Sequence, residues 1–198
     1  MSQYFENDEN VEHADLAYSF TLLGKGFTLY SDNGVFSKDG LDDGSRLLLE
    51  TIAKTDLGTN ILDLGCGIGP IGIVLAHFDP NRLITMADVS DRALECAKRN
   101  AIANGVNERV SILKSDVYEN IAASFSTIVT NPPIRAGKKV TYAMYAGALD
   151  HLNEGGRLVL VIRKQQGAPS CQRYLETLFS KVEVLCQHKG YRILIATK

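Results

Sequence analysis

The chain has 198 residues, of which 45% are hydrophobic and 22% are charged, and this balance predicts one globular domain with a substantial core. Its formal net charge of -2 excludes a globally basic nucleic-acid-binding surface, so any basic region must be local. No stretch approaches the roughly 18 apolar residues of a membrane span, and the amino-terminal segment lacks the features of a signal peptide, so we expect a cytoplasmic protein without membrane contact.

The amino-terminal part predicts an arm, a hairpin and a helix. Residues 1–14 are polar and acidic, and two short apolar stretches follow around the turn Gly24-Lys25-Gly26. The predicted elements are strands at 17–23 and 26–31 and a helix near 45–54. We expect residues 1–55 to pack on a main domain formed by residues 56–198, as one structural unit.

From residue 60 onward, predicted strands and helices alternate, which is typical of a parallel sheet with helices on both faces. The predicted strands lie at 61–64, 83–87, 110–113, 127–130 and 158–162, and the predicted helices begin at 70 or lie near 92–104, 142–152 and 171–179. A turn is predicted at 154–156. Residues 181–187 and 191–197 predict a closing hairpin, which makes one edge of the α/β sheet antiparallel.

A glycine loop with the sequence Asp-Leu-Gly-Cys-Gly-Ile-Gly follows the strand at 61–64 and ends at Gly69. Such a loop brings backbone close to a ligand at the carboxyl end of a sheet. The spacing also fits a dinucleotide fingerprint, but Pro70 removes an N–H that a pyrophosphate would use. Asp63 would repel a pyrophosphate and attract a sulfonium and an amino group. We therefore expect S-adenosylmethionine, with a nicotinamide nucleotide or a glycine turn without ligand as alternatives.

Two further acidic residues follow the ends of predicted strands. Asp88 comes directly after the strand at 83–87, and one carboxylate can accept hydrogen bonds from both ribose hydroxyls of a nucleoside. Asp116 follows the third strand and is predicted to accept from the adenine amino group. The alternatives are that Asp88 caps the next helix and that Asp116 only stabilises a turn.

The segment Asn131-Pro132-Pro133 ends the strand at 127–130, and its two prolines stiffen the loop. An exocyclic amine on a base is a weak nucleophile because its lone pair is delocalised into the ring. The Asn131 side-chain oxygen and the Pro132 carbonyl can accept both N–H bonds of such an amine and favour a pyramidal nitrogen. Preorganised acceptors of this kind stabilise a transition state electrostatically. The loop therefore predicts N-methyl transfer, with a proline turn that merely ends a strand as the alternative.

Four motifs together resemble the methyltransferase small domain of class I methyltransferases: Gly34-Val35-Phe36-Ser37, Asp63-Leu64-Gly65-Cys66-Gly67, Asp88-Val89-Ser90 and Asn131-Pro132-Pro133. Over residues 27–198 the chain is similar to the ribosomal RNA small subunit methyltransferase C family, which makes N2-methylguanosine in 16S rRNA. The resemblance implies a Rossmann-like, seven-stranded sheet with the last strand antiparallel. It also implies S-adenosylmethionine as methyl donor and S-adenosylhomocysteine as product.

The resemblance implies a set of site residues as well. Cofactor contacts are expected from Asp63, Gly65, Cys66, Gly67, Gly69, Asp88, Val89, Asp116, Val117 and Asn131. Catalytic contacts are expected from Asn131, Pro132 and Pro133. Ile134 stands where relatives usually carry Phe or Tyr, and a stacking aromatic there would contribute about 1–3 kcal/mol per base. Longer members of the family carry a second, degenerate copy of the domain, so this chain resembles a standalone single-domain form.

Local positive charge supports an RNA partner. Arg135, Lys138 and Lys139 follow the Asn-Pro-Pro loop, whereas Arg163 and Lys164 follow the strand at 158–162, so all five lie on one rim. Together with Phe36 and Ile134 they form the predicted substrate-binding set, with a solvated charged surface as the alternative.

The expected function is methylation of guanine N2 in small-subunit ribosomal RNA. The same chemistry on adenine N6 or a protein glutamine amide, or a non-catalytic cofactor- and RNA-binding assembly factor, are the alternatives. The expected partner is ribosomal RNA or the small ribosomal subunit. The oligomeric state is left open, with a monomer slightly favoured. Four cysteines without a CxxC pair predict buried thiols and no metal.

Overall fold

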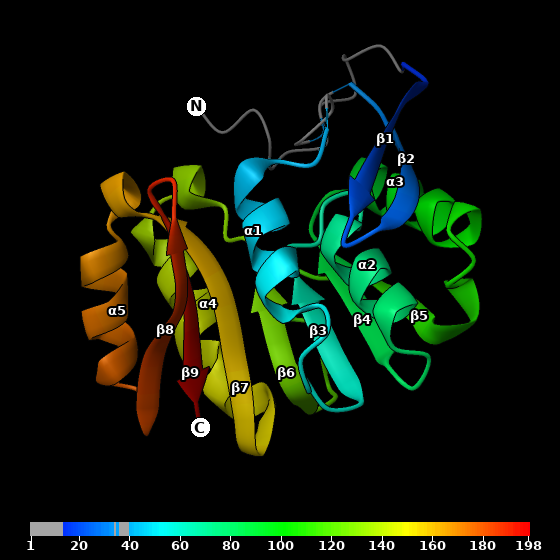
Figure 1. The fold of residues 1–198 in the computed structure, drawn as a ribbon. Helices are drawn as coiled ribbons and strands as arrows, with labels where there is room; N and C mark the ends of the chain where they lie inside the picture. Colours follow the sequence, from blue (N-terminus) through cyan, green and yellow to red (C-terminus); the bar gives the residue numbers. More distant parts are fainter. Residues whose placement is uncertain (1–13, 34, 36–39) are drawn as a thin grey trace.

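A seven-stranded sheet forms the centre of the molecule (Figure 1). The computed structural model describes residues 14–33, 35 and 40–198. The strands are β3 (Asn60–Leu64), β4 (Leu83–Asp88), β5 (Val110–Lys114), β6 (Phe125–Thr130), β7 (Leu152–Arg163), β8 (Lys181–His188) and β9 (Tyr191–Thr197), in the order β5-β4-β3-β6-β7-β9-β8. Strands β3 to β7 are parallel, and β9 is antiparallel to both of its neighbours. This confirms the Rossmann-like class and the antiparallel last strand.

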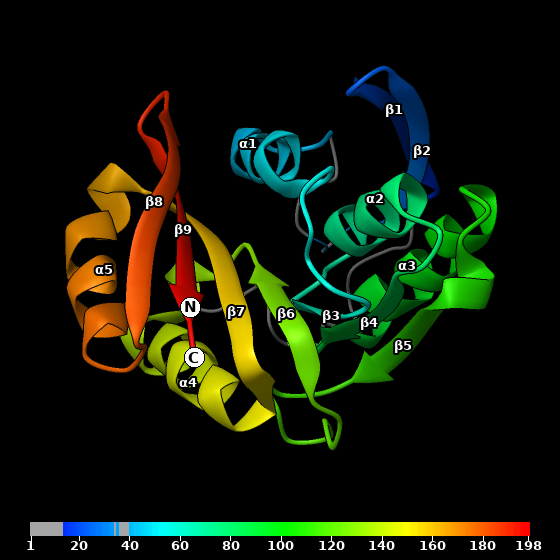
Figure 2. The ribbon, with the colours of Figure 1, turned by 60° about the horizontal axis from the view of Figure 1, so that its bottom comes forward.

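Helices cover both faces of this sheet, as Figure 2 shows. The helices are α1 (Asp43–Ile52), α2 (Pro70–Phe78), α3 (Asp91–Ala103), α4 (Lys138–His151) and α5 (Ala168–Glu176), with short 3₁₀ turns η1 (Asn107–Arg109), η2 (Ile134–Ala136) and η3 (Lys164–Gln166). One apolar cluster joins the sheet to α1, α2 and α3, and a second joins it to α4 and α5. Neighbouring residues of a strand enter opposite clusters, as Ile128 and Val129 do, because side chains alternate across a pleated strand.

The amino-terminal hairpin forms a separate two-stranded sheet of β1 (Leu16–Leu22) and β2 (Lys25–Ser31). Its turn is tighter than predicted, because Lys25 already pairs with Leu22 and only Leu23 and Gly24 remain, with φ of 49° and 82°. Two positive φ angles match the right-handed twist of a hairpin. The side chain of Asn100 in α3 accepts from the Tyr30 amide at 2.6 Å and donates to the Tyr30 carbonyl at 2.9 Å, which holds the hairpin against α3. The division of the chain near residue 55 stays a prediction.

Two predicted connections differ from the structure. The turn expected at 154–156 lies inside β7, where pairing with β6 jumps from Phe125↔Leu152 to Thr127↔Arg157. Gly155, with φ of 70°, accommodates this irregularity. The connection from β5 to β6 contains no helix among its described residues, 115–124, so helices do not alternate with strands throughout.

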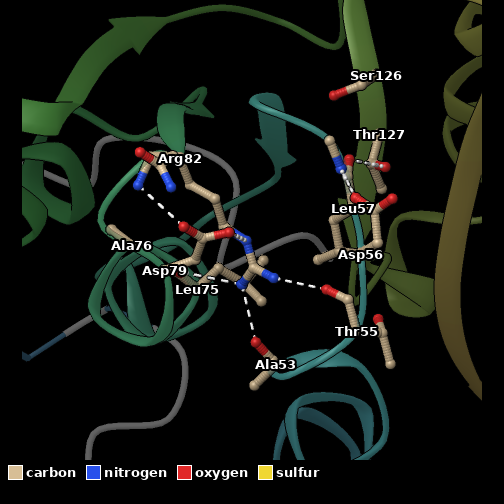
Figure 3. Close-up of polar contacts among 12 residues, drawn as sticks. Ala53, Thr55, Asp56, Leu57, Leu75, Ala76, Asp79, Arg82, Ser126 and Thr127 are labelled. Atoms are coloured by element: carbon tan, nitrogen blue, oxygen red, sulfur yellow. Dashed lines mark hydrogen bonds and ion pairs between the residues drawn. The ribbon is translucent and has the colours of Figure 1, made fainter.

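Buried Arg82 joins the carboxyl-terminal ends of α1 and α2 (Figure 3). Its guanidinium donates to the carbonyls of Ala53 at 2.9 Å, Leu75 at 3.1 Å and Thr55 at 2.7 Å, and pairs with Asp79 at 3.5 Å. Carbonyls at helix ends lack partners within the helix, so one buried cation satisfies several of them. Burial lowers the pKa of Arg82 from its usual value. This network fixes the carboxyl-terminal end of α1 relative to that of α2.

Among the described residues, no helix is long and apolar enough to cross a membrane. Within the same part of the chain, no group of three or more His, Cys, Asp or Glu side chains is placed to hold a metal ion.

Candidate active site

The two chemical motifs of the sequence lie side by side at the carboxyl edge of the sheet. Strands β3 and β6 are parallel neighbours, with Asp63 opposite Val129, so the glycine loop and the Asn-Pro-Pro loop leave the sheet next to each other. The Thr130 hydroxyl donates to the Leu64 carbonyl at 2.7 Å and ties the two strand ends together. Parallel strands lie about 4.8 Å apart, so both loops can contact one ligand.

The glycine loop presents open backbone. Gly65, Gly67 and Gly69 have φ of 72°, 55° and 88°, a region that side chains rarely adopt. Apart from the chain neighbours of Gly67, no atom of a described residue lies within 4 Å of the position that a Cβ on Gly67 would take, so the described residues leave this side of the loop open. Gly72 differs, because a Cβ there would meet Met86 Sδ at 2.6 Å. Gly72 therefore serves the packing of α2 on β4, and Gly67 lines the open side of the loop.

Asp88 stands next to this open side. Its Oδ2 accepts from the Gly67 amide at 2.8 Å, and its Oδ1 accepts from the Ser90 amide at 2.9 Å. Each carboxylate oxygen can accept a second hydrogen bond, so Asp88 can hold the loop and still receive hydroxyl donors. The Ser115 amide donates to the Asp88 carbonyl at 3.0 Å, which brings the segment that carries Asp116 alongside.

Val89 directly follows Asp88, and Asp116 and Val117 directly follow Ser115, whose amide is bonded to Asp88. Asp116 is exposed, whereas Val89 and Val117 are partly buried. Val117 has φ of 49°, which is costly for a β-branched residue and is found where surrounding structure enforces it. The roles of all three in cofactor binding stay predictions, because their backbone and exposure alone do not define a ligand.

Asp63 is fully buried beneath the loop. Its Oδ2 accepts from the Gly72 amide at 2.8 Å, and this bond caps α2, whose N-cap residue Gly69 has no side chain to do so. Its Oδ1 is buried and has no hydrogen-bond partner among the residues that the structure describes. Asp63 thus lies beneath the loop, and its role in cofactor binding stays a prediction.

Cys66 lies in the same loop and is also buried. Its thiol faces the Gly67 carbonyl at 3.4 Å, and burial raises its pKa well above the usual value. A buried thiol of high pKa is a packing group rather than a nucleophile.

The Asn131 side chain is held by the start of α1. Its Nδ2 donates to Asp42 Oδ1 at 3.2 Å and to Ser45 Oγ at 3.0 Å. Pro133 has φ of -73° and ψ of 79°, and the Ile134 amide donates to the Pro132 carbonyl at 2.8 Å, which forms an inverse γ-turn. The Pro132 carbonyl keeps its second lone pair, so it remains available as an acceptor.

The predicted substrate-binding residues mostly lie on the rim of this site. Arg135, Lys138, Lys139, Arg163 and Lys164 are exposed, and none of them forms an ion pair with another described residue. The Arg163 guanidinium lies 4.7 Å from the centre of the Tyr191 ring. Ile134 is partly buried and packs against the second apolar cluster. Phe36, with its neighbours Gly34 and Ser37, lies outside the described residues.

Sequence patterns missed three residues that organise the site. Asp42 and Ser45 hold Asn131, and Asn100 donates to the Ile68 carbonyl of the glycine loop at 2.9 Å. The segment Asp42-Asp43-Gly44-Ser45 carries a recognisable helix-capping signal, but a cap alone does not indicate which other residue it contacts. Asn100 lies inside a helix, where no local pattern distinguishes it.

The open backbone at Gly67, the Asp88 carboxylate beside it and the acceptors of the Asn-Pro-Pro loop fit a nucleoside methyl donor. This site on this sheet defines a class I S-adenosylmethionine-dependent methyltransferase, and S-adenosylmethionine is its cofactor. Residues 26–195 match the family model described as Methyltransferase small domain. The chain belongs to the methyltransferase small domain family.

Related proteins agree with this assignment. The chain is 45% identical to the uncharacterized protein YbxB of Bacillus subtilis, over 98% of each chain. It is 37% identical to the ribosomal RNA small subunit methyltransferase C of Serratia proteamaculans, over 83% of this chain and 47% of the relative. A solved structure of the Thermus thermophilus 16S rRNA guanine-N2 methyltransferase RsmC, in complex with AdoMet and guanosine, superimposes with a TM-score of 0.81 and 29% identity, over 92% of this chain and 50% of that one. The chain thus spans about half the length of these rRNA methyltransferases.

The placement of Asp88 gives a testable expectation for cofactor binding. Asp88→Ala should weaken the binding of S-adenosylmethionine by about 1.5–3 kcal/mol, because a charged acceptor beside the open loop is removed. Isothermal titration calorimetry measures this loss, and exposed Asp150→Ala serves as the charge-matched control. Affinity equal to that of the parent protein would contradict the assignment of Asp88 to the ribose.

Proposed function

We propose that this protein transfers a methyl group from S-adenosylmethionine to guanine N2 of small-subunit ribosomal RNA. The observation that carries the proposal is that the Asn-Pro-Pro loop leaves the sheet beside the glycine loop, and this loop carries two groups able to accept, the Asn131 side-chain oxygen and the Pro132 carbonyl. Two of the named relatives support the same class of reaction, since one is a ribosomal RNA small subunit methyltransferase and the other a 16S rRNA guanine-N2 methyltransferase.

In this proposal the methyl donor supplies an electrophilic methyl group bound to a sulfonium. Asn131 and Pro132 accept hydrogen bonds from the two N–H groups of the target amine and turn its lone pair toward the methyl group. The new N–C bond replaces the S–C bond of the donor, which leaves as S-adenosylhomocysteine, and the methylated amine releases one proton to water. The amine becomes more acidic as it acquires positive charge, so its hydrogen bonds to these oxygens strengthen in the transition state. A strong general base is then unnecessary.

We further propose the cofactor and substrate contacts of the site. The cofactor is held by the glycine loop and by residues at the carboxyl ends of β4, β5 and β6. Asp63 acts through its charge. The other cofactor-binding residues are Gly65, Cys66, Gly67, Gly69, Asp88, Val89, Asp116, Val117 and Asn131. The RNA is held by Ile134, Arg135, Lys138, Lys139, Arg163 and Lys164. Pro133 shapes the catalytic loop through its γ-turn.

Charge at the start of α4 supports a polyanionic partner. Lys138 and Lys139 are the first two residues of this helix, and its first turn contains no acidic residue. The amino-terminal end of a helix is positive and favours anions, so two lysines there oppose helix stability. A phosphate backbone bound at this end would offset that cost.

Methyl transfer can be measured directly. Tritiated S-adenosylmethionine should label protein-free small-subunit RNA or assembled small subunits, and nuclease digestion should release the label as N2-methylguanosine. Label in DNA as N6-methyladenine, or in a release factor as methylglutamine, would instead establish the same chemistry on another amine. Ile134 makes this comparison necessary, because it offers no stacking ring to select a base. Binding of RNA without transfer to any substrate would overturn the proposed reaction.

The basic rim gives a second expectation. Lys138→Ala combined with Lys139→Ala should lower the slope of log affinity against log salt by up to about 1.5, because RNA binding releases fewer counterions for each phosphate contact that is lost. Binding should weaken similarly for different RNA sequences, and the affinity for S-adenosylmethionine should stay unchanged. Fluorescence anisotropy at several salt concentrations measures the slope.

A matched pair of lysines provides the control for this experiment. Lys25 and Lys54 are exposed, and Lys54 lies over Phe78 at the carboxyl-terminal end of α2, away from the rim. The double variant Lys25→Ala, Lys54→Ala removes the same charge and should keep the parent's slope. Equal slopes for both double variants would show that Lys138 and Lys139 form only a solvated surface.

A further inference from the structure

The amide group of Asn131 is bonded through both of its N–H donors. Asp42 Oδ1 and Ser45 Oγ accept from Nδ2 at 3.2 Å and 3.0 Å. Both acceptors belong to the start of α1, although Asp42 and Asn131 are 89 positions apart in the sequence. The contact therefore depends on the tertiary fold and not on the loop itself.

The chemistry of these partners fixes the orientation of the amide. A carboxylate can only accept hydrogen bonds, so the atom of Asn131 that faces Asp42 must be the nitrogen. The oxygen then lies at the opposite edge of the planar amide group, and no described residue donates to it. A rotated amide would bring its oxygen against the Asp42 carboxylate and would offer N–H groups to a substrate amine, which needs an acceptor.

The start of α1 is itself held in place. Asp42 Oδ1 also accepts from the amides of Gly44 and Ser45, each at 3.0 Å, and caps the helix. A Cβ on Gly44 would come within 3.0 Å of the Tyr191 ring, so the helix start packs directly on β9. Ser45 is only 3% exposed, which limits the positions that its hydroxyl can take. One rigid helix end thus supplies both acceptors.

We propose that Asp42 and Ser45 are positioning residues for methyl transfer. They hold the Asn131 amide with its oxygen turned toward the target amine, and neither needs to touch the substrate. The inference rests on the proposed function, because it assigns these residues to the same transition-state acceptor. It predicts that their loss lowers kcat while leaving KM for RNA and the affinity for S-adenosylmethionine close to the parent values.

Single substitutions separate this role from a structural one. Ser45→Ala should lower kcat about tenfold, and Asp42→Ala, which also removes the helix cap, about 10–100-fold. Asp42→Asn keeps an oxygen acceptor and should recover most of the loss seen in Asp42→Ala. In an Asn131→Ala background, Ser45→Ala should cost nothing further, because the group that it positions is already absent.

Ser126→Ala is the matched control. Ser126 lies at the other end of the same strand, β6, and its hydroxyl donates one hydrogen bond to the Asn60 carbonyl at 2.7 Å. This variant also loses one hydrogen bond of a serine hydroxyl, but far from Asn131. Thermal unfolding of each variant should be recorded, so that a decrease in kcat is compared at equal folded fraction.

A second readout does not depend on activity. In ¹⁵N-asparagine-labelled protein, the side-chain amide signals that disappear in Asn131→Ala identify Asn131. These protons should exchange slowly with water in the parent and faster in Ser45→Ala and Asp42→Ala. Unchanged exchange together with unchanged kcat in Ser45→Ala would overturn the inference while leaving the proposed function intact. A parent protein that methylates no substrate would instead refute the proposed function, and the exchange data would then report only whether the amide is held.

Discussion

Replacing Asn131 with alanine should lower turnover about 10²–10³-fold and change the affinity for S-adenosylmethionine by no more than a few fold. The side-chain oxygen is the acceptor whose hydrogen bond strengthens as the target nitrogen acquires charge. Its removal therefore raises the barrier of the chemical step more than it weakens ground-state binding. Single-turnover methylation with saturating RNA isolates this step.

The same substitution has a structural consequence that must be measured beside it. Without Asn131, Asp42 keeps its two backbone donors, and Ser45 keeps its place in the helix, so α1 should remain folded. Asn107→Ala provides the control, since Asn107 is exposed in η1. Turnover retained in Asn131→Ala would mean that the Pro132 carbonyl suffices as the acceptor.

The sequence predicted the parts of the fold that depend on local patterns. Apolar residues that alternate or recur at helical spacing lie in two buried clusters, and the glycine loop lies where its preceding strand ends. The adjacency of the two loops followed from the parallel topology, because the carboxyl ends of parallel strands meet at one edge. These features need no knowledge of distant contacts.

The remaining features depend on contacts between distant segments. No local pattern states that the cap of α1 will meet Asn131, or that Asn100 will hold the Ile68 carbonyl. The irregular pairing within β7 likewise depends on its partner strand β6. The sequence predicts that Asp63 lies near the glycine loop, but only packing shows that its carboxyl group is buried beneath the loop.

The burial of Asp63 makes folding stability depend on pH. Burial raises the pKa of Asp63 from 3.8 to about 7, against the opposing hydrogen bond from Gly72 and with a smaller contribution from Asp88. Between these two values the folded protein binds a proton that the unfolded chain has released. Asp63 therefore contributes stability that is fully present below about pH 4 and is lost as pH rises to about 7.

The expected size of this effect is large for one side chain. At about 1.4 kcal/mol for each pKa unit, the full window corresponds to about 4 kcal/mol, and the part between pH 5 and 8 to about 2–3 kcal/mol. Urea denaturation across this range should show the free energy of unfolding of the parent falling relative to that of Asp63→Asn. Exposed Asp150→Asn removes the same charge and should follow the parent.

If the free energy of unfolding changes with pH in the same way in the parent and in Asp63→Asn, Asp63 is already ionised in the folded protein across this range. If the two proteins differ as expected, saturating S-adenosylmethionine should reduce the difference. The donor carries a net positive charge, and a cation beside the glycine loop favours the ionised form of Asp63 and lowers its pKa. The difference between the two proteins could instead keep the same pH dependence when the donor is added. Asp63 would then only cap α2, through its bond to Gly72, and would not respond to the ligand.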